Sequence, residues 1–185
     1  MLRITIIALL SALGIASFVY ATQPVRSPYA GQETRGIKSL SDREVQDYLA
    51  GRGMGLAKTA ELNNYPGPAH VLELSDRLGL SPEQKARTRV LFIAMETRAK
   101  DLGKTLVEQE TRLDWMFASR QISREQLKSS LEGIARLQGE LRQVHLDAHL
   151  AQAEILNHEQ IRKYGELRGY GTGGSASHDA SAHQH

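Results

Sequence analysis

Cysteine is absent from this sequence of 185 residues. A disulfide framework, a thiolate metal site and a cysteine nucleophile are therefore excluded. Aromatic residues make up only 5% of the chain, and the formal net charge is only +2. A surface that stacks bases and neutralises many phosphates needs more aromatic and more basic residues. We therefore expect no nucleic-acid partner.

The motifs that mark common enzyme sites are also missing. There is no nucleophilic serine motif and no His-Glu-x-x-His pair. The stretch GRGMG at Gly51–Gly55 has neither the spacing nor the preceding strand pattern of a nucleotide-binding loop, and we interpret it as a flexible bend. Because no residue set suggests a nucleophile, a base and an oxyanion donor together, we expect that the protein is not an enzyme.

The N-terminus has the pattern of a targeting segment. Arg3 is followed by an uncharged run from Ile4 to Val19, and Ala21 ends a Val-Tyr-Ala triplet that suits a signal peptidase. This pattern predicts a secretory signal peptide over residues 1–21. The alternative is an uncleaved membrane anchor, since the run approaches the roughly 20 residues of a spanning helix.

Composition divides the rest of the chain into three parts. Residues 22–39 are rich in Pro, Gly, Ser, Gln and Thr and predict a flexible lead-in. Residues 171–185 consist mainly of Gly, Ser, Ala and His and predict a disordered tail. Between these two parts, residues 40–170 predict one all-helical domain.

Four helix starts in this domain share one pattern, a capping residue three positions before Glu or Gln. The cap oxygen accepts from an amide of the first turn, and the Glu or Gln reaches back to the amide of the cap. These boxes are Ser41–Glu44, Ser81–Gln84, Ser123–Gln126 and Asn157–Gln160. Two of them lie within one repeated pentapeptide, LSPEQ at Leu80–Gln84 and LNHEQ at Leu156–Gln160. We interpret the repeat as a device that starts a helix after a tight turn.

Two long segments with heptad spacing of apolar residues follow the second and third boxes. The first runs from Ser81 to about Ser119, the turn is at 120–122, and the second runs to Ile155. So short a turn makes the two helices antiparallel. Shorter helices are predicted over 42–50, 68–78 and 158–167. The predicted fold class is all-α, a long antiparallel helical hairpin with shorter flanking helices.

Such a hairpin leaves apolar surface uncovered. Residues Val90–Met95 are apolar around the whole helix, and Leu146 and Leu150 form an i,i+4 pair off the heptad seam. Apolar surface of this kind commonly binds another chain or a ligand. We therefore expect a homodimer.

Together these features resemble the Spy/CpxP family of periplasmic proteins, whose signature is a repeated Leu-Thr-x-x-Gln. Leu80, Ser81 and Gln84 match it with Ser in place of Thr. Leu156, Asn157 and Gln160 match it with Asn in place of Thr. Both replacements keep a capping side chain. The resemblance implies a periplasmic location and a curved, interlocked antiparallel homodimer.

The resemblance also implies functions of two different classes. Some members of the family are ATP-independent chaperones that hold unfolded periplasmic proteins during envelope stress, and others restrain a membrane sensor kinase. A related branch comprises heavy-metal sensors and zinc-resistance proteins. For the chaperone function we expect unfolded polypeptide to contact Lys85, Arg89, Val90, Ile93, Leu146 and Leu150.

The alternative function is binding of a divalent metal ion such as zinc, nickel or copper. His145 and His149 are i,i+4 on one predicted helix, so their rings can converge on one ion. The competing interpretation is two solvated histidines beside the seam. The tail adds His178, His183 and His185, which could chelate an ion loosely. The helical pattern already accounts for a fold, so we expect that no cofactor is required for folding.

Overall fold

The computed structural model describes residues 26–170. The predicted signal peptide and the predicted histidine-containing tail lie outside these residues. The chain divides into two compact units at Glu33 and Thr34. In the first unit, the described residues 26–33 form a turn in which the amide of Ala30 donates to the carbonyl of Ser27 at 3.1 Å.

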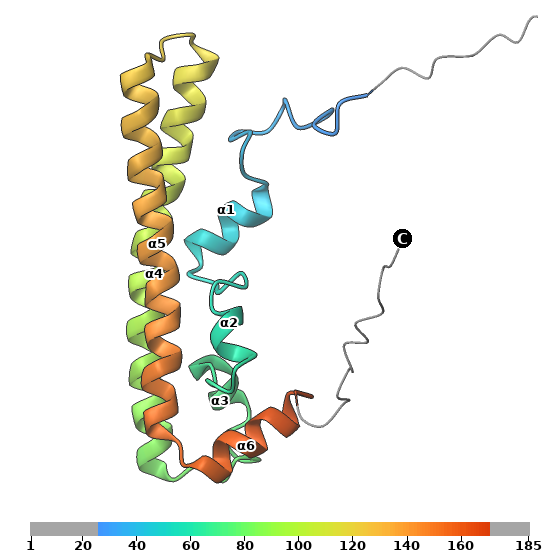
Figure 1. Cartoon of the computed structure of the whole chain (residues 1–185), viewed down its shortest axis with the longest axis vertical. Helices are drawn as coiled ribbons and strands as arrows, with labels where there is room; N and C mark the ends of the chain where they lie inside the picture. The colour runs from blue at the N-terminus through green and yellow to red at the C-terminus, as the bar shows by residue number, and fades with distance from the viewer. Residues whose placement is uncertain (1–25, 171–185) are drawn as a thin grey trace, which may run out of the picture. The chain divides into compact units, whose positions relative to one another are not determined.

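Residues 34–170 are helical, without a strand, which confirms the predicted fold class. The helices are α1 (Asp42–Leu49), α2 (Lys58–Glu61), α3 (Pro68–Glu73), α4 (Pro82–Ala118), α5 (Arg124–Ile155) and α6 (His158–Leu167). Figure 1 shows α4 and α5 side by side along their length, with α1, α2 and α3 following one another along the hairpin. Among the described residues no helix has the length and hydropathy needed to cross a membrane.

All four predicted capping boxes are present and start α1, α4, α5 and α6. In the α4 box the Ser81 hydroxyl accepts from the amide of Gln84 at 3.1 Å, and the Gln84 side chain accepts from the amide of Ser81 at 3.1 Å. In α6 the Asn157 side chain accepts from the amide of Gln160 at 2.8 Å. These local bonds satisfy amides that have no partner within the helix.

The hairpin closes at residues 119–123, and its seam is the main core. Arg120 has φ 57°, a left-handed conformation that turns the chain at the end of α4. The predicted heptad residues meet in one buried cluster, which comprises Ala99, Leu102, Leu106, Ile134, Leu137 and Leu141. Near the open end of the hairpin the seam becomes polar, where the side-chain amide of Gln152 donates to the Thr88 hydroxyl at 3.2 Å.

Helix α1 packs closely on α4 at Gly103. A Cβ at Gly103 would lie 2.2 Å from the backbone carbonyl oxygen of Tyr48, so only glycine permits this approach. Just before α1, the predicted lead-in ends in side chains that are bonded to α4. The Lys38 ammonium lies 3.0 Å from the Asp114 carboxylate, and the Ser39 hydroxyl donates to Glu110 at 2.8 Å.

The segment between α1 and α4 differs from the prediction in two ways. The helix predicted over 68–78 ends at Glu73, and the chain turns through Gly79, at φ 65°, to reach Leu80. The apolar spacing persists through this turn because Leu74 and Leu78 pack against Leu80 and Leu156 in a second core cluster. Helix α2 was not predicted, since its four residues begin without a side-chain cap.

The two copies of the pentapeptide meet at the open end of the hairpin. The side-chain amide of Gln84 donates to the Gln160 oxygen at 2.9 Å, and that of Gln160 donates back to the Gln84 oxygen at 3.0 Å. Gln84 also donates to the carbonyl of Ile155, at the end of α5, at 2.9 Å. The repeat therefore does more than start two helices: its glutamines join the start of α4 to the start of α6.

Candidate functional site: a histidine-lined cavity

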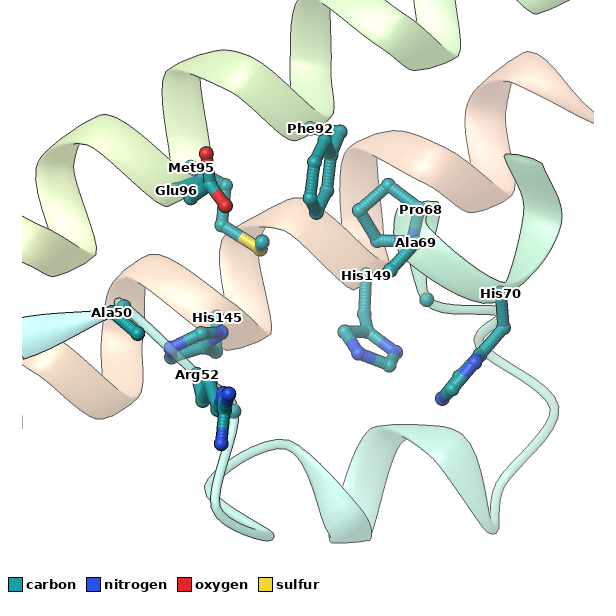
Figure 2. Close-up of a pocket in the computed structure, with 13 residues that line it drawn as sticks. Ala50, Arg52, Pro68, Ala69, His70, Phe92, Met95, Glu96, His145 and His149 are labelled. Carbon is teal, nitrogen blue, oxygen red and sulfur yellow. The ribbon is translucent and has the colours of Figure 1, made fainter. Parts of the chain in front are cut away.

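A cavity of about 290 Å³ lies between α4, α5 and the segments that connect α1 to α3. Figure 2 shows His145 and His149 on α5, with Phe92 and Met95 on α4 and His70 on α3. An adjoining hollow shares the three histidines and is also lined by Glu61 and Tyr170. Three of the chain's seven histidines thus border one site.

His145 and His149 lie on the same face of α5 because four residues make slightly more than one helical turn. They continue the buried stripe that contains Leu141, Ala148 and Gln152. Only 3% of His145 and 9% of His149 is exposed. The interpretation of two solvated histidines is therefore wrong, because α2 and α3 pack on α5, and residues 50–53, which follow α1, line the same cavity.

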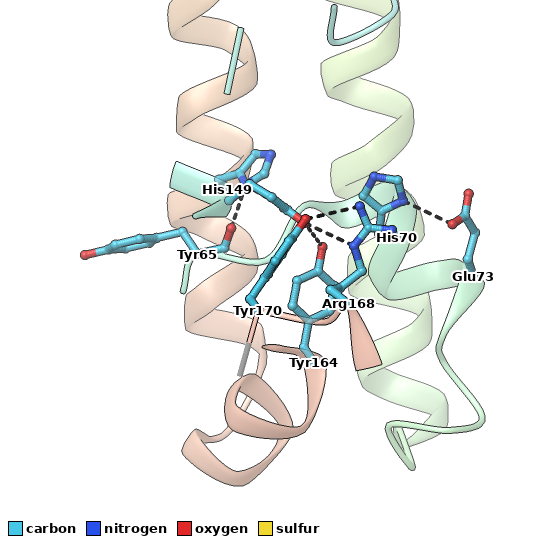
Figure 3. A network of polar contacts seen from close by, with 8 residues as sticks. Tyr65, His70, Glu73, His149, Tyr164, Arg168 and Tyr170 are labelled. Atoms are coloured by element: carbon cyan, nitrogen blue, oxygen red, sulfur yellow. Dashed lines mark hydrogen bonds and ion pairs between the residues drawn. The ribbon is translucent and has the colours of Figure 1, made fainter. Parts of the chain in front are cut away.

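The tautomer of His149 follows from its hydrogen bond. Its Nδ1 lies 2.7 Å from the carbonyl oxygen of Tyr65, which can only accept, so Nδ1 carries a hydrogen, and in the uncharged ring Nε2 is the nitrogen with the lone pair (Figure 3). Gly67 lies against the same ring, since a Cβ there would be 3.0 Å from Nε2. A side chain at position 67 would thus push the imidazole aside.

The surroundings of His145 favour the uncharged form of its imidazole. Burial lowers the pKa of its imidazole, and the nearby His149 lowers it further. Its Nε2 is buried and has no hydrogen-bond partner among the described residues. A buried polar atom of this kind is rare in folded proteins and calls for an explanation.

Glu61 reaches the site from α2. One of its oxygens, Oε1, accepts from the hydroxyl of Tyr164 at 2.6 Å, the hydroxyl of Tyr170 at 3.0 Å and Nε of Arg168 at 3.3 Å. The other oxygen, Oε2, is buried without a partner in the described part of the chain and lies 3.8 Å from Nδ1 of His149. Burial and the bond to Glu61 raise the pKa of Tyr164, so this phenol stays protonated and donating.

Two buried side-chain atoms without hydrogen-bond partners among the described residues, Nε2 of His145 and Oε2 of Glu61, and one oriented imidazole therefore border the same site. Imidazole nitrogen and carboxylate oxygen are donor types that zinc and nickel accept, and an imidazole fixed by a backbone carbonyl is the usual arrangement behind a metal ligand. Within residues 26–170, however, no three His, Cys, Asp or Glu side chains come together closely enough to hold an ion as a group. The side chains at this site are of the types that bind zinc or nickel. They are fewer than the four ligands of a closed zinc site.

Sequence reasoning found His145 and His149 but missed Glu61, His70 and Tyr170. Glu61 and His70 lie on short helices, and Tyr170 follows the last helix, so no long periodic pattern marks them. His70 is half-buried, and its Nδ1 lies 3.1 Å from the carboxylate of Glu73 (Figure 3). His178, His183 and His185 lie outside the described residues.

The six residues expected to contact unfolded polypeptide do not form one patch. Val90 is 69% exposed and Leu150 is 51% exposed. Thr88 and Gln152 form a hydrogen bond between the two helices. Val90 is two residues from Thr88 and Leu150 is two residues from Gln152, which corresponds to a rotation of about 200° around each helix. Val90 and Leu150 therefore face away from the seam on different helices. Ile93 is exposed on α4 and Arg89 is exposed beside Val90, whereas Lys85 and Leu146 are half-buried.

No family model, curated protein or solved structure matches this chain.

Proposed function

We propose that this protein binds a divalent metal ion, such as zinc, nickel or copper, at the histidine-lined cavity and acts as a metal sensor or buffer in the periplasm. The observation that supports the proposal is the pair of buried side-chain atoms without a hydrogen-bond partner in the described part of the chain, Nε2 of His145 and Oε2 of Glu61, beside the oriented imidazole of His149. Burying polar atoms without partners costs free energy, and a cation bound to the carboxylate and to Nε2 of His145 in the tautomer that leaves this nitrogen unprotonated would offset that cost.

Each residue has a distinct part in this proposal. His145 and His149 supply imidazole nitrogens, and burial, which lowers the pKa of His145, favours the uncharged form that binds a metal. The carboxylate of Glu61 offsets the charge of the ion. The other oxygen of Glu61 accepts a hydrogen bond from Tyr164 of α6. A shift of Glu61 on metal binding would therefore move a contact of α6, and a sensor needs such a coupling between its metal site and another part of the fold.

Calorimetric titration of the purified protein with zinc, nickel and copper salts tests this proposal. His145→Gln and His149→Gln together should weaken binding at least tenfold. His158→Gln is the matched control, because His158 is exposed at the start of α6 and away from the cavity. Helicity measured by circular dichroism should not change on chelation, since the caps and the seam hold the fold without an ion. Equal affinity in the double variant and the control would refute the metal site.

A second candidate function is binding of unfolded polypeptide, as the Spy/CpxP resemblance implies. It is favoured by the large apolar side chains that α4 leaves in solvent, which include Val90, Ile93, Trp115 and Phe117. Val90 and Ile93 are neighbours at i,i+3 spacing, and exposed apolar side chains that lie together commonly mark an interaction site. Suppression of aggregation of a denatured client should weaken in Val90→Ser/Ile93→Ser and persist in Leu150→Ser. A chelator should have no effect on the suppression of aggregation. Equal suppression by the unaltered protein, Val90→Ser/Ile93→Ser and Leu150→Ser would argue against a binding surface on α4.

A further inference from the structure

The closed end of the hairpin exposes large aromatic side chains, in a chain that has few of them. Aromatic residues make up 5% of the sequence, and Trp115 is its single tryptophan. Trp115 is 57% exposed and Phe117 is 55% exposed, and both lie in the last turn of α4. Between Ile93 and Trp115 the helix rises by about 33 Å, at 1.5 Å per residue. The exposed pair Val90 and Ile93 therefore belongs to a different surface.

Three arginines lie at the same end as these aromatic side chains. Arg112 precedes Trp115 by three positions and so lies next to it on the surface of α4. Arg120 is in the turn that joins α4 to α5, and Arg124 is the first residue of α5. All three side chains are exposed. None of them has an ion-pair partner within residues 26–170.

The carboxylates at this end do not cancel that charge. Asp114 precedes Trp115 directly, and its carboxylate lies 3.0 Å from the Lys38 ammonium, which neutralises it. Glu125 is the other carboxylate between residues 112 and 125, and it accepts a hydrogen bond from the Ser123 hydroxyl at 2.9 Å. One carboxylate thus remains against three guanidinium groups, and the closed end of the hairpin is positively charged.

The directions of the two aromatic side chains decide which partner fits. Met116 is buried and faces α5. Trp115 and Phe117 stand one residue before and one residue after it, about 100° to either side around α4, so they point to opposite sides of the hairpin. A flat patch on a globular partner would contact one of them and leave the other in solvent. A bilayer surface that receives the end of the hairpin contacts both, because lipid surrounds whatever enters it.

The side chains at this end are of the types that bind a lipid surface. Tryptophan resides at the level of the headgroups, since its ring is amphipathic. Arginine keeps its charge among the phosphates while its apolar stem lies deeper. Anionic phospholipids also attract basic residues electrostatically.

We propose that the closed end of the hairpin, residues 112–125, binds the surface of a bilayer that contains anionic phospholipid. Trp115 and Phe117 enter the headgroup region, and the three arginines contact lipid phosphates. The contact is peripheral. Figure 1 shows α6 at the opposite end of the hairpin, so this contact leaves α6 away from the lipid. The inference holds whether or not the histidine-lined cavity binds a metal ion.

The single tryptophan makes the contact directly measurable. Emission of Trp115 should shift to shorter wavelength when the full chain meets vesicles of phosphatidylcholine and phosphatidylglycerol, and lipid with brominated acyl chains should quench it. Vesicles of phosphatidylcholine alone should bind at least tenfold more weakly, and added salt should weaken binding to the anionic vesicles. The signal arises at the closed end, so contacts of other segments with lipid do not contribute to it.

Matched variants locate the contact. Arg120→Gln/Arg124→Gln should weaken binding to the anionic vesicles at least tenfold. Arg87→Gln/Arg89→Gln is the control, because it removes two exposed arginines near the open end of the hairpin, and it should leave binding unchanged. Circular dichroism checks that each variant is folded.

Three results would overturn the proposal. Unchanged emission of Trp115 with anionic vesicles would show that the closed end stays in water, even if the protein sediments with the lipid. Equal losses in Arg120→Gln/Arg124→Gln and in the control would show that net charge, and not the closed end, determines binding. A shift to shorter wavelength that grows with protein concentration in the absence of lipid would place a second copy of the chain on the closed end.

Discussion

Replacing Gln84 with Glu separates the two tasks that the repeated pentapeptide performs. A capping box accepts Glu as well as Gln, because its third residue needs only an oxygen that accepts from the cap amide. The pairing of Gln84 with Gln160 needs a donor, because the Gln84 amide nitrogen faces the Gln160 oxygen and the Ile155 carbonyl oxygen, each at 2.9 Å. Gln84→Glu keeps the oxygen that accepts from the Ser81 amide in the capping box. It replaces the nitrogen that donates to Gln160 and Ile155 with a carboxylate oxygen.

The expected loss can be worked out from these contacts. Two hydrogen bonds disappear, each with a net contribution of about 1 kcal/mol, and two acceptors are left facing a charged oxygen at the half-buried position 84. We therefore expect Gln84→Glu to lower the free energy of unfolding by about 2–4 kcal/mol at neutral pH. Ser81→Ala removes the cap and leaves the glutamine pair, so it should cost only about 1 kcal/mol.

Urea denaturation followed by circular dichroism measures these differences, with Gln126→Glu as the matched control. Gln126 occupies the same place in the box of α5 and is exposed, so its replacement by Glu should change stability by less than about 0.5 kcal/mol. Near pH 4 the introduced carboxyl of position 84 becomes protonated and can donate again, so part of its destabilisation should disappear. Equal stability of Gln84→Glu and Gln126→Glu at neutral pH would show that the pair contributes nothing beyond capping.

Three further predictions concern packing, pH and assembly. Gly103→Ala should destabilise the protein by at least about 2 kcal/mol, because its Cβ would overlap the Tyr48 carbonyl. Gly139→Ala, where nothing lies within 4 Å, should instead stabilise α5 by up to about 1 kcal/mol in the same urea assay. Because the folded protein lowers the pKa of His145 below the ordinary 6.5, the unfolded chain binds the proton more readily. The contribution of His145 to the free energy of unfolding should therefore be fully present above about pH 6.5 and be lost as the pH drops through the pKa that His145 has in the folded protein. In His145→Gln the free energy of unfolding should depend less on pH over this range. A monomer at micromolar concentration in analytical ultracentrifugation would contradict the homodimer expected from the exposed α4 surface.

The sequence predicted those features of the fold whose causes lie within a few residues. The four capping boxes join positions three apart, so the starts of α1, α4, α5 and α6 could be read directly. The heptad spacing predicted the hairpin, because a seam of regular period can be buried only against another seam. The same reasoning extended α3 too far, since Leu74 and Leu78 keep an apolar spacing while serving the core of a turn.

Contacts between distant segments were beyond the reach of local patterns. The sequence presented the two glutamines as separate capping residues, and only the return of α6 to the start of α4 joins them as a pair. The i,i+4 spacing placed His145 and His149 on one face of α5 but could not say whether that face is solvated. The tertiary structure decided this, because α2 and α3 pack on α5, and Glu61 of α2 comes within 3.8 Å of His149. Helical periodicity specifies which face a side chain occupies, whereas burial and ligand sets depend on which other segments cross that face.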